Sequence, residues 1–228
     1  MTQKKTDSID NQRLLGLEPY LINFIKLYNN KKFPKVTMLS GLKGIGKYTL
    51  ITHLMSYILD KSNYNLNNFE RSNTSDFNLN FKNKMFDNII FINKEKEPSI
   101  KIETIRELKN KLTTTILNNK PRFIIIDEVE NLNINSSNAL LKIIEEPSEN
   151  NFFILINNQT KVILDTVMSR AINFRINLKE VKRIEIIEKL IQHHKITNQI
   201  DFKNSYISPG NFFYISIICE ENKINLDD

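Results

Sequence analysis

Three of the five glycines in this 228-residue chain fall between Gly41 and Gly46, and Lys47 follows them directly. An apolar stretch at 36–39 precedes the cluster, and apolar residues at helical spacing follow it. Glycines at a strand-to-helix junction let the backbone approach phosphate oxygens and point its N–H groups at them. The helix N-terminus adds partial positive charge, and a lysine at this position reaches the terminal phosphates. We therefore predict a phosphate-binding loop formed by Gly41, Gly44, Gly46 and Lys47, with a tight turn that binds nothing as the alternative.

The loop departs from the usual pattern at its last position. A phosphate loop that hydrolyses nucleotide has Ser or Thr after its lysine to hold magnesium, and here that residue is Tyr48. Thr49 comes one residue later, rotated by about 100° around the helix. A loop with Tyr48 and Thr49 at these positions is compatible with ATP and Mg²⁺ as cofactors. We do not expect it to hydrolyse ATP.

A second candidate feature is an acidic strand end. Four apolar residues at 123–126 lead into Asp127 and Glu128. In P-loop ATPases an aspartate at such a strand end holds magnesium, and a neighbouring carboxylate can orient the attacking water. An aspartate that merely caps the next loop is the common alternative. Because this pair follows the glycine loop in the sequence, we favour a nucleotide site in which Asp127 is the magnesium ligand.

Strand and helix patterns alternate along most of the chain. Helices are expected at 11–34, 100–117 and 138–144, and again from 178 onward. Short apolar strands are expected at 36–39, 89–92, 123–126, 152–156 and 172–176. This alternation predicts an α/β fold with a mostly parallel five-stranded sheet flanked by helices. Residues 61–88 are rich in Asn and Ser and are expected to form a loop or an insertion.

Composition narrows the class of protein. The net charge of +6 comes from 25 Lys and 7 Arg in a chain that also has 32 Asn and 35 Ile, so the charge is only weak support for a nucleic-acid partner. A single cysteine, Cys219, excludes a disulfide framework. No apolar run approaches the roughly 18 residues of a membrane span, and a signal peptide is not apparent. The expected compartment is the cytoplasm.

Three motifs resemble one family. Residues 138–147 read NALLKIIEEP and closely resemble the NALLK-x-LEEP helix of bacterial clamp-loader subunits. Residues 166–171 read TVMSRA and look like the T-x-x-SRC motif of the same proteins, with Ala171 in place of the usual Cys. The glycine loop is similar to the GIGKxT variant of delta-prime subunits. Over about residues 11–176 the chain thus resembles the delta-prime family of bacterial DNA polymerase III, AAA+ proteins of the sliding-clamp loader.

The resemblance implies a domain plan and two further site residues. An AAA+ P-loop domain would span 1–176, with 61–88 as an Asn-rich insertion, and a small helical lid would span 177–228. Arg170 would be an arginine finger that acts in trans on the nucleotide of a neighbouring subunit, where a guanidinium can present two donors to a γ-phosphate. Asn157, or its neighbour Asn158, falls at the family's sensor position, with a polar loop residue as the alternative.

The chain also departs from the family. Relatives usually carry four cysteines that bind zinc between the P-loop and the acidic strand, and this sequence has none there, so no zinc is expected. The chain ends soon after Ser208-Pro209-Gly210, a segment that resembles part of the lid, so the helical collar domain is expected to be absent. Asn211 stands where the family's nucleotide-sensing Arg would be.

These features lead to one main functional hypothesis. We expect a subunit of the DNA polymerase III clamp loader that does not hydrolyse ATP itself and gives Arg170 to a neighbouring ATPase subunit. Its implied partners are the gamma/tau and delta subunits, and, through the complex, the sliding clamp and primer–template DNA. The alternative is an active gamma/tau-like ATPase that uses Lys47, Asp127 and Glu128. An unrelated P-loop NTPase is the third reading.

Overall fold

A five-stranded parallel sheet forms the centre of the computed structural model, which describes residues 12–72, 74–82, 87–94, 97–114, 120–197 and 200–222. The order across the sheet is β4-β5-β6-β1-β7, and every neighbouring pair is parallel. The strands of this sheet are β1 (Val36–Ser40), β4 (Ile89–Ile92), β5 (Arg122–Ile126), β6 (Asn151–Asn157) and β7 (Ile172–Arg175).

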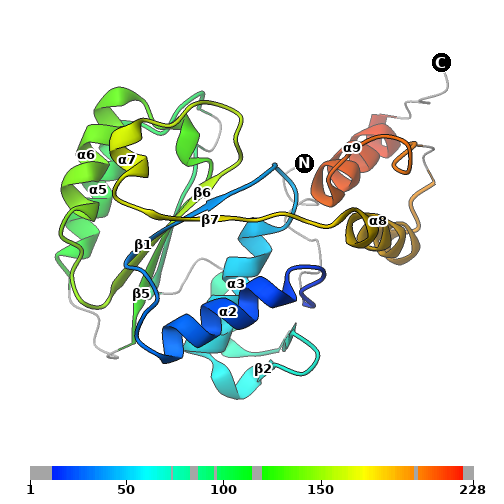
Figure 1. Cartoon of the computed structure of the whole chain (residues 1–228), viewed down its shortest axis with the longest axis horizontal. Helices are drawn as coiled ribbons and strands as arrows, with labels where there is room; N and C mark the ends of the chain where they lie inside the picture. Colours follow the sequence, from blue (N-terminus) through cyan, green and yellow to red (C-terminus); the bar gives the residue numbers. More distant parts are fainter. Residues whose placement is uncertain are drawn as a thin grey trace.

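Helices cover both faces of this sheet (Figure 1). On one face lie α2 (Glu18–Asn29) and α3 (Lys47–Leu59), and on the other lie α5 (Ile102–Leu112), α6 (Ile134–Ile144) and the short α7 (Asp165–Met168). Parallel strands that are covered on both sides are apolar at every position rather than at alternate ones. This is why the central strands read as continuous apolar runs in the sequence.

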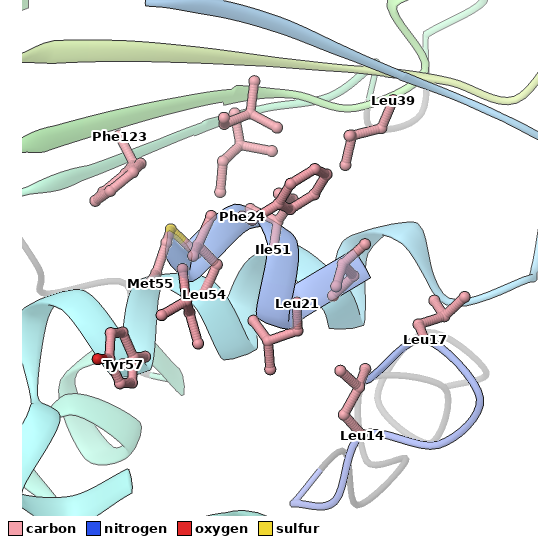
Figure 2. Close-up of a cluster of buried hydrophobic side chains, with 14 of the residues drawn as sticks. Leu14, Leu17, Leu21, Phe24, Leu39, Ile51, Leu54, Met55, Tyr57 and Phe123 are labelled. Atoms are coloured by element: carbon pink, nitrogen blue, oxygen red, sulfur yellow. The ribbon is translucent and has the colours of Figure 1, made fainter. Parts of the chain in front are cut away.

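Successive residues of the central strands supply two separate cores. In β5, Phe123 and Ile125 pack with α2 and α3, whereas Ile124 and Ile126 pack with α5 and α6. The same alternation holds along β6. Figure 2 shows the first of these cores, in which side chains of α2 and α3 point up against Leu39 and Phe123 of the sheet.

Two helices follow the sheet as a smaller unit. They are α8 (Glu180–His194) and α9 (Pro209–Asn222), and they pack against each other to one side of the sheet (Figure 1). Their apolar cluster is separate from the two sheet cores and consists of Ile187, Ile196, Phe212, Phe213 and Ile217. The proposed boundary between 176 and 177 falls directly after β7, and the division into domains stays a prediction.

The five strands lie where the sequence places them, within one or two residues. The first helix is shorter than the predicted 11–34. Gly16 has a φ of +78° and Lys31 a φ of +55°, so the chain leaves helical geometry on both sides of α2. The predicted helix 100–117 ends at Leu112 as α5, and residues 115–119 lie outside the described part. The helix predicted at 138–144 is longer than expected, since α6 begins at Ile134. Asn133 caps it by accepting a hydrogen bond from the Ser136 backbone N–H.

The prediction of a loop over 61–88 was wrong for much of that segment. It contains the 3₁₀ turn η1 (Lys61–Asn63), a small hairpin of β2 (Tyr64–Asn65) and β3 (Glu70–Arg71), and α4 (Asp76–Lys82). Tyr64 and Phe77 are buried in the first core. A few aromatic residues anchor this segment, and they do not produce the aliphatic periodicity that reveals a helix or strand. Residues 73 and 83–86 lie outside the described part.

Within the described residues, none of the helices is both long and apolar enough to cross a membrane.

The first core yields a stability prediction. Leu54 in α3 is completely buried between the sheet and α2, so Leu54→Ala should lower the free energy of unfolding by about 2–5 kcal/mol through lost burial and a residual cavity. Leu79→Ala is the matched control, because Leu79 is about half exposed on α4, and it should cost less than about 1 kcal/mol. Urea denaturation of both variants measures the difference. Equal losses would contradict the placement of α3 in the core.

Candidate phosphate-loop site

The glycine loop connects the carboxyl end of β1 to the start of α3. β1 lies inside the sheet, with β6 on one side and β7 on the other. Ligands of open α/β sheets bind at the carboxyl ends of strands, where the strand order reverses. Gly44 and Gly46 have φ values of +82° and +96°, a backbone region that residues with side chains rarely adopt. Gly46 is the N-cap residue of α3, so no capping side chain competes for the first N–H groups of the helix.

Lys47 is buried beneath its own loop. Its side chain is 3% exposed, and Nζ donates hydrogen bonds to the carbonyl oxygens of Gly41 at 2.6 Å and Leu42 at 2.8 Å. Burial lowers the pKa of the Lys47 amine to about 8, and the negative charge of Asp127 opposes that shift only in part. The ion pair between Lys43 and Glu128, at 2.6 Å, shows that the fold brings the glycine loop and the predicted acidic strand end together.

Asp127 and Glu128 lie in different environments although they are neighbours. The carboxylate of Asp127 accepts a hydrogen bond from the Glu128 amide at 2.9 Å, and burial raises its pKa. Glu128 has a left-handed backbone, with φ of +54°, which turns its side chain away from the course of β5. Of the two, Asp127 is the more deeply buried.

Two lysines hold the carboxylate of Glu128. Lys43 Nζ lies 2.6 Å from Oε1, and Lys94 Nζ lies 3.1 Å from Oε2. Burial alone would raise the pKa of Glu128, but the hydrogen bonds from the two lysines outweigh it and the pKa is lowered. Neither lysine was predicted from the sequence. Lys43 lies inside the glycine motif itself, whereas Lys94 follows β4 and is brought near only by the fold.

Tyr48 faces an aromatic cluster. Its ring is 5.3 Å from the ring of Phe91 on β4 and 6.4 Å from that of Phe81 on α4, measured between centroids. The residue is partly buried at the edge of the first core. Because the ring is held there, Tyr48 stands as a packing residue at the position where a short hydroxyl would hold magnesium. Thr49 is half-buried on the next position of α3.

Asn157 lies at the end of β6, beside the start of the glycine loop. Its Nδ2 donates to the Ser40 hydroxyl at 3.3 Å, and its Oδ1 accepts from the backbone N–H of Gln159 at 2.8 Å. The backbone N–H of the next residue, Asn158, donates to the carboxylate of Glu130, and Thr160 donates its hydroxyl to the same group. Glu130 is 5% exposed and was also missed. It ties the end of β6 to the segment after β5.

Arg170 is on the surface after α7. Its side chain is 35% exposed, and it donates to the Thr166 carbonyl at 3.1 Å and to the carboxylate of Glu145 at 2.9 Å. These partners come from the two motifs that carried the resemblance, since Glu145 belongs to the EEP end of the first and Thr166 begins the second. The fold therefore brings the two motifs together around this guanidinium.

The residues fit a phosphate group better than they fit a complete magnesium–nucleotide site. The loop conformation and Lys47 provide the backbone donors and the cation that a phosphate requires, and the carboxylate of Asp127 would suit a bound cation. The short hydroxyl next to the lysine is missing. In the part of the chain that the structure describes, no three His, Cys, Asp or Glu side chains are grouped so that they could hold a metal ion.

Sequence comparison identifies the family. Residues 17–180 match the family described as DNA polymerase III, delta subunit. The chain belongs to this family. The subunit delta' of Buchnera aphidicola subsp. Schizaphis graminum is 28% identical over 162 residues, which cover 71% of this chain and 48% of the relative. The subunit delta' of Bacillus subtilis is 32% identical over 98 residues, 42% of this chain and 30% of the relative. The chain spans about half, or less, of the length of these curated relatives.

Solved structures agree on the fold. A DNA polymerase III gamma subunit-related protein from Thermotoga maritima superposes with a TM-score of 0.52 at 18% identity, covering 78% of this chain and 52% of that one. The RuvB Holliday junction branch migration motor from the same organism has a TM-score of 0.54 at 15% identity, covering 90% and 61%. At these identities the likeness shows the fold alone, and it is the AAA+ fold that the resemblance implied.

The lowered pKa of Lys47 predicts a pH-dependent stability. In the unfolded chain this lysine titrates near its ordinary value of 10.5, and in the folded chain near 8, so between these values the unfolded state binds more protons and stability rises with pH. From pH 7 to 9.5 the wild type should gain up to about 2 kcal/mol relative to Lys47→Met. Denaturant titrations at both pH values measure this difference.

Lys161→Met, which removes an exposed lysine, controls for the loss of one charge. A stability of the wild type minus that of Lys47→Met that stays constant or falls as the pH rises would contradict the buried position of the amine.

Proposed function

We propose that this chain is a non-hydrolysing subunit of a DNA polymerase III clamp loader and that it supplies Arg170 to the nucleotide site of a neighbouring ATPase subunit. The observation that carries the proposal is the position of Arg170, which is exposed yet held at two points by Thr166 and Glu145. An arginine that acts in trans has to be accessible and oriented before the partner arrives. In other P-loop systems a group of this kind is worth about 10³–10⁵ in rate.

The chain's own phosphate loop supports the non-hydrolysing part of the proposal. A carboxylate that orients water has to be free to accept its proton or hydrogen bond, and Glu128 is ion-paired with both Lys43 and Lys94. Tyr48 packs among aromatic rings where a hydroxyl ligand of magnesium would stand. ATP and Mg²⁺, when bound, would supply a phosphate for Lys47 and a cation for Asp127.

The second candidate function is an active ATPase of the same assembly. One observation favours it: Lys47 is present beneath the glycine loop, and the acidic strand end meets that loop through the ion pair of Lys43 with Glu128. In this reading the ion pairs of Glu128 would have to open when nucleotide binds. The partners in both readings are the gamma/tau and delta subunits and, through the complex, the sliding clamp and primer–template DNA.

The arginine finger is tested in the assembled complex. Arg170→Ala should slow ATP turnover by the reconstituted clamp loader at least about tenfold while nucleotide binding by the ATPase subunits is unchanged, because a finger acts on the transition state. Arg175→Ala is the matched control, since Arg175 is an exposed arginine on the adjoining edge strand β7. Turnover that is equally fast with both variants would exclude Arg170 as a finger.

Hydrolysis by the chain itself is tested separately. The isolated protein should show no ATP turnover above that of a Lys47→Ala variant. Glu128 is ion-paired, and Tyr48 stands where a Ser or Thr hydroxyl would hold magnesium. Phosphate release is measured for both proteins at saturating ATP and Mg²⁺. Turnover that disappears in Lys47→Ala would favour the active ATPase, and it would leave the result for Arg170 unaffected.

A further inference from the structure

The helical unit touches the glycine loop directly. The hydroxyl of Ser208 donates to the carbonyl oxygen of Lys43 at 2.7 Å, and the amide of Gly210 donates to the carbonyl oxygen of Gly44 at 2.9 Å. Ser208 is buried, with 4% of its surface exposed. The start of α9 is thus bonded to the middle of the phosphate loop, which lies 165 residues earlier in the chain.

The contact depends on two facing glycines. A Cβ atom on Gly210 would lie 2.9 Å from both Cα and O of Gly44, and one on Gly44 would lie 2.4 Å from the Ser208 hydroxyl. Gly44 also needs its positive φ, but Gly210 lies within α9 with an ordinary backbone. Alanine is the better residue in a helix. Close approach to Gly44 therefore explains the glycine at 210, and conformational freedom does not.

A buried arginine holds the segment that makes this contact. Arg183 of α8 is 1% exposed and donates to the carbonyl oxygen of Ile207 at 3.1 Å, directly before Ser208. Its guanidinium also lies 5.3 Å from the ring of Tyr206 and is paired with Glu180. Both helices of the unit thus fix the position of Ser208 and Gly210.

We propose that Ser208 and Gly210 form a latch that keeps the helical unit closed on the phosphate loop whether or not a nucleotide is present. The latch uses the carbonyl oxygens of Lys43 and Gly44, whereas an anionic phosphate is bound through N–H groups. Closure therefore does not need a ligand to bridge the two parts, and ligand binding does not need to open them. This inference is independent of the role of Arg170.

Hydrogen exchange of the full chain tests the latch, measured with and without ATP and Mg²⁺. In the wild type, peptides covering 41–47 and 205–212 should be protected without nucleotide and change little when it is added. In Gly210→Ala the added methyl group meets the backbone of Gly44, so both peptides should exchange at least about tenfold faster while a peptide from β5 is unchanged. Tyr214→Ala, at an exposed position of α9, is the control and should leave 41–47 protected.

A second variant keeps the test decisive if Gly210→Ala unfolds the helical unit. Ser208→Ala adds no atoms and removes one hydrogen bond, so exchange at 41–47 should rise about fivefold. A folded Gly210→Ala or Ser208→Ala protein with wild-type exchange would overturn the proposal. So would a wild type whose 41–47 and 205–212 peptides become protected only when nucleotide is added.

Discussion

The inner strands of the parallel sheet, β5, β6 and β1, have to be covered on both faces, and the rest of the structure depends on that requirement. Because neighbouring strands are parallel, each connection returns over a face of the sheet and the carboxyl ends all meet at one edge. The glycine loop after β1, Asp127 after β5 and Asn157 at the end of β6 come together there for this reason. The two cores, the first of which is drawn in Figure 2, thus position the candidate site.

Charges at this edge are balanced within the chain. Lys47 is bound to the carbonyl oxygens of its own loop, and Glu128 is bound to Lys43 and Lys94. Burial raises the cost of any charge that is left alone, so a partly enclosed site without a ligand is stable only with such pairing. The same pairing engages groups that hydrolysis would need to be free. Local electrostatics and the proposed role of the chain as a provider of Arg170 are therefore consistent with each other.

The helical unit adds a second source of order. Its own small core makes α8 and α9 a packed pair, and Arg183 positions the segment that reaches the phosphate loop. Gly44 thereby meets two demands, a positive φ for the loop and the absence of a side chain that would meet Ser208. Gly44 and Gly210 lie where one backbone segment contacts another directly.

The sequence alone determined the α/β class, the five strands, the position of the glycine loop and the acidic strand end, because short apolar runs and glycine spacing act locally. It also contains the two motifs to which Glu145 and Arg170 belong, and both motifs resemble those of one family. Only the tertiary structure decided what those residues touch. Lys94 reaches Glu128, Tyr48 packs on Phe91, and Ser208 bonds to Lys43 across long stretches of chain. Such contacts have no period or spacing in the sequence, since they depend on how the helices pack on the sheet. The segment 61–88 was misread for the same reason, as its order comes from a few buried aromatic rings.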